Sequence, residues 1–449
     1  SLFFSFGFFL LGIGLYWLYI SISVVSGGPF WLSIFLISLL ALSMAIYYAL
    51  TGFLIVFSYK KYNSKVITLL FFAPSIWVVM EWFRGFLFSG FPWFTLGYSQ
   101  TSTWLTGWAP IGGVYLLSFI TALSSSLLLL IFLNIKPYRY LGIIFSIYLC
   151  SLFLESIEWT ESKGDTLNVS LVQGGIVQEK KWLRSEFNNT LNLYKKSLMV
   201  SDSMDLVIWP EVAIPTLSGR VKPYLEELNE IMLSKKIQLL IIGINTLDEE
   251  RNVYNSLLTM GADNMIYNKR HLVPFGEYFP VPDFIKDWLQ EMKLPNNDIT
   301  KGDFIQRMPK LNDIFIATSI CFEDIFASEQ LIFQPEANVL VNITNNAWFG
   351  ESIASEQHFQ MSRMRAIETG RFLLRTSNTG ITAIVKPDGT IQEQLDPYEF
   401  SILQGSFQPM QGLTPYIKFG NYLIVILVIF MMSLGYYLVL SLKKKETNG

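Results

Sequence analysis

The chain has 449 residues, of which 51% are hydrophobic and only 15% are charged, and its mean hydropathy is +0.38. This composition excludes an ordinary soluble protein of this length and indicates segments that lie in a membrane. The formal net charge of −3 gives no reason to expect a nucleic-acid ligand, and two cysteines do not suggest a disulfide framework. Because Ser1 lies inside an apolar segment, we expect the natural N-terminus to precede it.

Six apolar segments have the length of helices that cross a membrane, although the fifth is short. A hydrocarbon layer about 30 Å thick needs roughly 20 residues per helix. The expected spans are Leu2–Ile22, Phe30–Phe57, Val66–Phe83, Ile111–Leu133, Tyr140–Phe153 and Tyr422–Leu442. Basic clusters at 60–65, 136–139 and 443–445 fall on one side when these spans are counted. Since Lys and Arg favour the cytoplasmic side, we expect the polar block between the last two spans on the opposite side.

The predicted organisation has four parts. Residues 1–160 form transmembrane helices, residues 164–415 an extracytoplasmic domain, residues 420–442 a last transmembrane helix, and residues 443–449 a basic cytoplasmic tail. In the extracytoplasmic domain, apolar runs of strand length alternate with segments of helix length. The expected strands are 167–173, 206–209, 237–243, 255–260, 314–320, 339–343, 372–376 and 381–385, and the expected helices are 180–199, 221–233 and 357–370. This alternation predicts an α/β fold rather than a β-sandwich.

Three reactive side chains follow predicted strands of this domain. Glu211 ends one strand, Lys269 starts the loop after another, and Cys321 ends the run 314–320. Catalytic groups of α/β folds gather just beyond strand ends. A carboxylate can take the thiol proton, and an ammonium group stabilises a thiolate and then an oxyanion, so the three residues could form an acyl-transfer site. Each also has a simpler explanation, because a free cysteine is more often buried packing and a lone charge is more often solvated.

Longer motifs surround these residues. They are Trp209-Pro210-Glu211, the run from Lys269 to Tyr278 (KRHLVPFGEY) and Ile320-Cys321-Phe322-Glu323, and they resemble the three signatures of the nitrilase, or carbon–nitrogen hydrolase, superfamily. With helices on both sides, and with matching runs at 90–93 and 345–350, nearly the whole chain resembles the apolipoprotein N-acyltransferase family. The resemblance implies a membrane protein with an α-helical transmembrane bundle and an α/β, nitrilase-like αββα sandwich domain that faces the periplasm.

The resemblance also implies the roles of individual residues. Glu211 is the expected base, Lys269 the oxyanion stabiliser and Cys321 the nucleophile, and the residues expected to support them are Glu277, Glu323, Phe322 and Trp182. Phe322 stands where relatives can carry tyrosine, so a hydroxyl is absent here. The family layout also contains further helices before the point where this chain starts.

The implied reaction needs no metal or cofactor. Cys321 takes an acyl chain from a membrane phospholipid as a thioester and passes it to the α-amine of the S-diacylglyceryl-cysteine that begins an apolipoprotein. This is the last step of lipoprotein maturation, at the inner membrane of Gram-negative bacteria, and the expected partners are the phospholipid, the apolipoprotein and the bilayer, without nucleic acid. The alternative is a membrane-anchored amidase that hydrolyses a lipid-like or peptide amide. A transporter is less favoured because the spans contain few charges.

Four aromatic residues are candidates for lipid binding: Trp93, Trp348, Phe284 and Trp288. Trp93 lies in an aromatic-rich loop between spans, where simple anchoring at the membrane interface is the alternative. Phe284 and Trp288 lie in an apolar segment after Lys269, which we interpret as a mobile lid over the thioester. The alternative is that this segment only packs on the domain.

Overall fold

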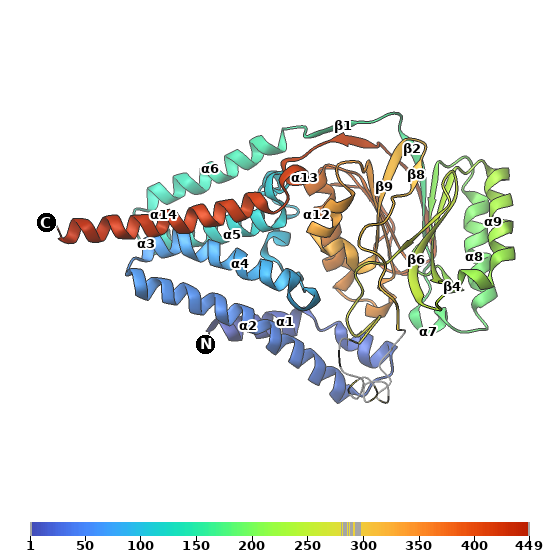
Figure 1. Cartoon of the computed structure of the whole chain (residues 1–449), viewed down its shortest axis with the longest axis horizontal. Helices are drawn as coiled ribbons and strands as arrows, with labels where there is room; N and C mark the ends of the chain where they lie inside the picture. Colours follow the sequence, from blue (N-terminus) through green and yellow to red (C-terminus); the bar gives the residue numbers. More distant parts are fainter. Residues whose placement is uncertain are drawn as a thin grey trace.

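A computed structural model describes residues 2–279, 281, 285, 287, 291 and 298–447. A bundle of apolar helices forms one end of the molecule, and an α/β domain forms the other (Figure 1). The principal bundle helices are α1 (Leu2–Gly14), α2 (Phe30–Tyr62), α4 (Ala73–Phe86), α5 (Ala109–Phe132), α6 (Pro137–Glu155) and α14 (Tyr422–Thr447). Within the described chain, five helical segments are long and apolar enough to cross a membrane: Phe30–Tyr62, Lys65–Ser89, Thr106–Phe132, Pro137–Glu155 and Tyr422–Lys445.

The segment expected as one span over residues 2–22 is divided. Helix α1 ends at Gly14, and a short helix, η1 (Ile20–Val25), follows a turn. The carbonyl of Gly14 accepts a hydrogen bond from Gln357 Nε2 of the α/β domain at 3.3 Å. Trp17, in the turn, donates its indole N–H to Gln357 Oε1 at 3.1 Å. The helix therefore ends where its backbone and the following turn bind Gln357 of the α/β domain. Hydropathy alone cannot show such contacts.

The basic clusters lie at one end of the bundle. Lys60 and Lys61 lie in the last turn of α2, Lys136 directly precedes α6, and Lys444 and Lys445 lie in the last turn of α14. Figure 1 shows these helix ends, with the C-terminus, at the end of the bundle that faces away from the α/β domain.

Two sheets lie face to face in the α/β domain. The first has seven strands in the order β14-β2-β3-β5-β6-β7, with β4 paired to β5, and the second has six in the order β13-β12-β11-β10-β9-β8. The first sheet contains β2 (Leu167–Gln173), β3 (Leu206–Ile208), β4 (Ile214–Leu217), β5 (Leu239–Leu247), β6 (Val253–Gly261), β7 (Met265–Asn268) and β14 (Ser401–Phe407). The second contains β8 (Lys310–Leu311), β9 (Ile314–Ile320), β10 (Val339–Thr344), β11 (Leu373–Ser377), β12 (Ala383–Val385) and β13 (Ile391–Gln394). A small pair, β1 (Thr160–Ser162) and β15 (Met410–Gly412), lies where the chain enters and leaves the domain.

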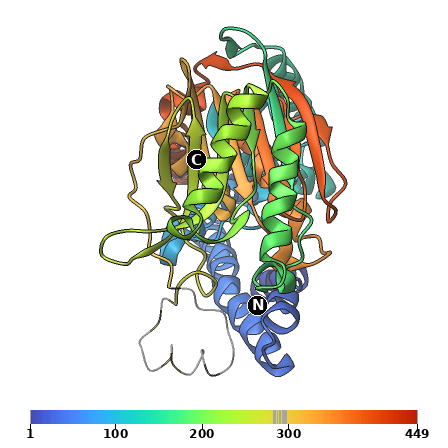
Figure 2. The ribbon, with the colours of Figure 1, turned by 90° about the vertical axis from the view of Figure 1, so that its right-hand side faces the viewer.

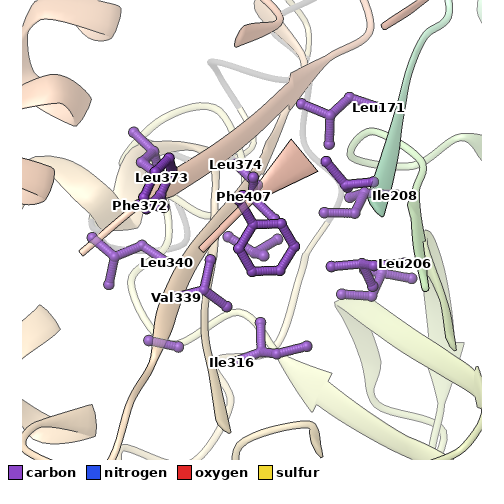
Figure 3. Close-up of a cluster of buried hydrophobic side chains, with 14 of the residues drawn as sticks. Leu171, Leu206, Ile208, Ile316, Val339, Leu340, Phe372, Leu373, Leu374 and Phe407 are labelled. Atoms are coloured by element: carbon purple, nitrogen blue, oxygen red, sulfur yellow. The ribbon is translucent and has the colours of Figure 1, made fainter. Parts of the chain in front are cut away.

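The hydrophobic core fills the space between the two sheets. Leu171, Leu206 and Ile208 of the first sheet approach Ile316 and Val339 of the second in Figure 3. Helices α8 (Phe187–Val200) and α9 (Lys222–Lys235) lie side by side across the outer face of the first sheet (Figure 2). Helix α12 (Ala354–Thr369) lies between the second sheet and the bundle (Figure 1). The expected αββα sandwich beside a transmembrane bundle is therefore confirmed.

Buried polar contacts join the domain to the bundle. In α5, Gly113 adopts a φ of +67°, which interrupts the regular helix. The N–H of Val114 donates to Glu368 Oε1 of α12 at 2.8 Å, and Arg365 pairs with Glu368 at 3.1 Å. Arg365 also donates to the hydroxyl of Tyr98, a residue of the bundle, at 3.2 Å. Because these contacts are buried, they hold the α/β domain in one orientation on the bundle.

The prediction of one continuous helix over residues 180–199 is partly wrong. The range 180–199 contains the end of a short helix, α7 (Gln178–Lys181), a turn, and then α8. The turn allows Lys181 to point inward, where its ammonium group donates to the backbone carbonyl of Glu211 at 3.0 Å. A continuous helix would not satisfy that contact, so tertiary packing overrides the local helical pattern.

Candidate active site

The chain makes a tight turn at Cys321. Strand β9 ends at Ile320, and Cys321 has a φ of +53° and begins a 3-10 helix, η7 (Cys321–Ile325). For a residue other than glycine this left-handed conformation costs about 1–2 kcal/mol. Glu323 holds the turn, because its Oε2 accepts from Ile320 N–H at 2.7 Å and its Oε1 accepts from His271 N–H at 3.2 Å. The thiol is thus presented at the end of the strand, next to the loop that carries Lys269.

Two carboxylates share one ammonium group nearby. Lys269 Nζ lies 2.9 Å from Glu277 Oε1 and 3.3 Å from Glu211 Oε1. The side-chain amide of Asn255 donates to the same two oxygens, at 2.7 Å to Glu211 and 2.9 Å to Glu277. Glu277 Oε2 accepts from Val273 N–H at 2.8 Å, which closes the loop after Lys269. We call Glu211, Asn255, Lys269 and Glu277 the cavity cluster.

These groups meet in one cavity. Glu211 follows β3, Lys269 follows β7 and Cys321 follows β9, and all three line a space of about 500 Å³. The opposite wall belongs to the bundle and is largely apolar, with Leu36 of α2 and Ile22 of η1 among its residues. A polar reacting end facing an apolar wall suits a substrate that carries a hydrocarbon chain.

The cavity cluster acts on the ionisation of the nucleophile. Burial raises the pKa of the Cys321 thiol to about 12, and the nearby Glu211 carboxylate adds to this while Lys269 opposes it. Burial by itself would lower the pKa of Lys269, but the charges of Glu277 and Glu211 outweigh it and raise this pKa. At neutral pH the site therefore holds a neutral thiol beside a permanent ammonium ion. The thiol can lose its proton to Glu211 as it attacks a substrate carbonyl.

Two further polar residues of the site were not anticipated from the sequence. Asn255 lies inside β6, which also contains Ser256 and Thr259, and a polar residue in a strand carries no signal until its neighbours are known. Lys181 is buried beside Glu211, and burial lowers its pKa to about 8, an effect that the charges of Glu211 and Cys321 partly oppose. The adjacent Lys180 is exposed, and the sequence offers no reason to choose between the two.

The expected supporting residues, and the lipid-binding candidate Trp348, lie in different places around Cys321. Trp182 and Trp348 line the cavity, and Trp182 is 51% exposed at its edge. Glu323 lies behind the nucleophile and also accepts from the hydroxyl of Tyr267 at 3.0 Å. The ring of Phe322 packs against Phe326, with ring centroids 5.1 Å apart, and is not among the described residues that line the cavity.

Trp93 lies outside this cavity. It is 3% exposed, donates its indole N–H to Gln357 Oε1 at 2.7 Å and packs against Trp17. It lines a second space of about 760 Å³, which lies between bundle helices and α12. Phe284 and Trp288 lie outside the described residues, so the lid stays a prediction. Nearby, the described Phe279 is buried against Leu32 of α2.

Comparison with known proteins matches both parts of the chain to known domains. Residues 1–127 match the apolipoprotein N-acyltransferase N-terminal domain, and residues 168–412 match the carbon-nitrogen hydrolase family. The apolipoprotein N-acyltransferase of Nitrosomonas europaea is 35% identical over 445 residues, which cover 98% of this chain and 89% of that one. That of Methylococcus capsulatus is 37% identical over 423 residues, covering 93% and 83%. The chain belongs to the apolipoprotein N-acyltransferase family. It is accordingly a multi-pass membrane acyltransferase with a carbon–nitrogen hydrolase domain.

Proposed function

We propose that the protein transfers an acyl chain from a membrane phospholipid, through a thioester on Cys321, to the α-amine of the N-terminal S-diacylglyceryl-cysteine of an apolipoprotein. The observation that carries this proposal is the single cavity in which Cys321, Lys269 and Glu211 face the apolar wall of α2. Such a wall can receive the hydrocarbon part of a lipid while its ester lies against the polar cluster. The relatives' shared name supports the apolipoprotein as the acceptor.

In the first half-reaction, Cys321 Sγ attacks the ester carbonyl as its proton passes to Glu211. The negative charge that develops on the carbonyl oxygen is stabilised by Lys269 and by the backbone N–H of Phe322. When the tetrahedral intermediate collapses, the carbon–oxygen bond to the glycerol breaks. The leaving alkoxide takes the proton from Glu211 and departs as a lysophospholipid, and the thioester remains.

In the second half-reaction, the neutral α-amine of the acceptor attacks the thioester. Glu211 receives the proton that the amine loses, and Cys321 leaves as a thiolate that is reprotonated. An amine attacks a thioester more readily than an oxygen ester, so transfer competes well provided that water is excluded. The apolar residues of α2 and η1 on the cavity wall serve this exclusion.

We infer that the catalytic domain lies on the periplasmic side of the inner membrane. The basic helix ends lie at the end of the bundle away from the α/β domain, and Lys and Arg favour the cytoplasmic side. This placement gives the cavity access to the outer leaflet of that membrane.

Intact-protein mass spectrometry after incubation with phospholipid tests the function. We expect a mass increase of one acyl chain on Cys321, lost again when a diacylglyceryl-cysteine peptide is added, with the acyl group recovered as an amide on the peptide. Cys321→Ala should form no adduct, and Cys150→Ala serves as the matched control because Cys150 lies on the bundle helix α6. Release of free fatty acid without peptide acylation would instead support the hydrolytic alternative.

A further inference from the structure

A second group of buried polar residues lies behind Cys321. It consists of Asp324 in η7, Asn342 in β10, His358 and Ser362 in α12, and Arg375 in β11, and we call it the rear network. All five residues are at most 2% exposed. They are absent from the described residues that line the cavity, so their contacts serve the protein itself.

The rear network fixes the side chain of Asn342. Its Oδ1 accepts from Arg375 Nη1 at 2.6 Å, and its Nδ2 donates to Ser319 Oγ at 3.0 Å. Nδ2 also donates to the backbone carbonyl of Cys321 at 3.2 Å. Because the guanidinium group can only donate, Oδ1 must face Arg375 and the amide N–H groups must face Ser319 and Cys321.

Arg375 is itself held on the far side. Its Nη1 lies 3.1 Å from Asp324 Oδ2, and its Nη2 donates to His358 Nδ1 at 3.1 Å. His358 Nε2 therefore carries the ring proton and donates it to Asp324 Oδ1 at 2.8 Å. Strands β9, β10 and β11 run parallel, with Asn342 opposite both Ser319 and Arg375 in register. The position of Asn342 is thus set by three strands and one helix together.

The hydrogen bond from Asn342 to the Cys321 carbonyl also sets the direction of the Phe322 N–H, because both groups belong to one peptide bond. A trans peptide is planar, so its C=O and N–H point in opposite directions. When Asn342 holds the carbonyl of Cys321 toward the interior, the N–H of Phe322 must point away from Asn342. Phe322 lies in the first turn of η7, where N–H groups have no acceptor within the helix.

We propose that Asn342 is a positioning residue for acyl transfer. By holding the Cys321 carbonyl, it aims the Phe322 N–H at the oxyanion that forms when Cys321 Sγ attacks. Asn342 does not touch the substrate and acts through this one peptide. The proposal rests on the proposed function, because it concerns the oxyanion of that reaction.

Two reactions of the same thiol test this role. Acylation by a long-chain p-nitrophenyl ester passes through an oxyanion, whereas alkylation by iodoacetamide forms none. The experiment compares three purified proteins in detergent: wild type, Asn342→Ala and Asn342→Asp. The p-nitrophenol burst measures acylation, and the loss of free Cys321 thiol measures alkylation. Asn338→Ala is the matched control, because Asn338 is a buried asparagine that binds the N–H of Phe315 and the carbonyl of Met410, just before β10 begins.

We expect Asn342→Ala to slow acylation at least about tenfold. The effect should stay below the about 10²–10³-fold cost of removing an oxyanion donor, because the Phe322 N–H is misdirected rather than lost. The alkylation rate should change less than about twofold, since alkylation forms no oxyanion. Asn342→Asp keeps the size of the side chain and its contact with Arg375 but faces Cys321 with a carboxylate oxygen. It should slow acylation at least as much, so the test holds even if Asn342→Ala does not fold. Asn338→Ala should leave both rates unchanged.

Equal acylation in wild type and both Asn342 variants would overturn the inference, and so would a parallel loss of acylation and alkylation. The result also separates this inference from the proposed function. If the activated ester acylates wild type but phospholipid does not, the proposed donor is wrong while Asn342 is still tested. If neither donor acylates Cys321, both proposals fail.

Discussion

The cavity cluster and the rear network lie on opposite sides of Cys321 and differ in charge balance. In the cavity cluster, Glu211 and Glu277 share the single cation Lys269. In the rear network, Asp324 is matched by Arg375. There, burial first and then the charge of Arg375 lower the pKa of His358, so its ring stays neutral near pH 7. The cavity cluster thus holds one more carboxylate than its own cation, with Lys181, whose pKa is lowered to about 8, beside it, whereas the rear network pairs one carboxylate with one guanidinium group.

This difference shows how buried charges can serve two purposes within one site. The extra carboxylate next to the thiol can accept a proton, and the adjoining cavity lets a substrate reach it. The balanced network exchanges no proton with a substrate and stabilises one arrangement of three strands and a helix. Variants on the cavity side should therefore change chemistry more than stability, and loss of the ion pair between Asp324 and Arg375 in the rear network should do the reverse.

The largest expected effect is on the cavity side. Lys269→Met should lower the rate of Cys321 acylation by about 10²–10³-fold, because it removes a donor to the oxyanion. Single-turnover acylation followed by mass spectrometry measures this rate. Lys195→Met is the matched control, since Lys195 pairs with Glu227 between α8 and α9, away from the cavity. Acylation at the wild-type rate in Lys269→Met would show that the oxyanion rests elsewhere.

Breaking the ion pair of the rear network should lower the free energy of unfolding. Arg375→Met leaves Asp324 buried without its cation, which typically costs about 3–5 kcal/mol of unfolding free energy. The expected result is a clear fall in the thermal midpoint of the detergent-solubilised protein. The control is Arg307→Met, because the ion pair of Arg307 with Asp263 is exposed on the arginine side and worth about 0–1 kcal/mol. Equal midpoints for the two variants would contradict the distinction between the two sides.

The smallest effect should appear in the pH dependence of thiol alkylation. With a pKa of about 12, Cys321 should react with iodoacetamide about tenfold faster for each pH unit above 7, without the plateau of a free thiol near its pKa of about 8.5. Lys181→Met should slow alkylation a few-fold below pH 8, because a nearby positive charge favours the thiolate. Above pH 8 the difference should disappear, since Lys181 itself loses its proton at about this pH. A plateau near pH 8.5 would show that the thiol is not held neutral.

The outline of the molecule could be predicted from sequence because its signals are local. A run of about 20 apolar residues indicates a transmembrane helix, and a short β-branched run such as Ile314–Ile320 indicates a buried strand. Cys321, Lys269 and Glu211 could be selected because they lie in motifs that resemble a known family. The division of the first expected span at Gly14 was missed, because it depends on Gln357, more than 300 residues away.

The polar partners of the site were decided by the tertiary structure. Asn255 joins Glu211 to Glu277 only because β6 pairs with β5 and the loop after Lys269 folds back over it. Asn342 reaches Cys321 only because β10 lies between β9 and β11 in one register. A buried amide or charge gains its role from the groups that replace water around it, and strands distant in sequence supply those groups. The sequence by itself determined which elements form and where the reactive side chains lie along them, and the packing of those elements determined what each side chain contacts.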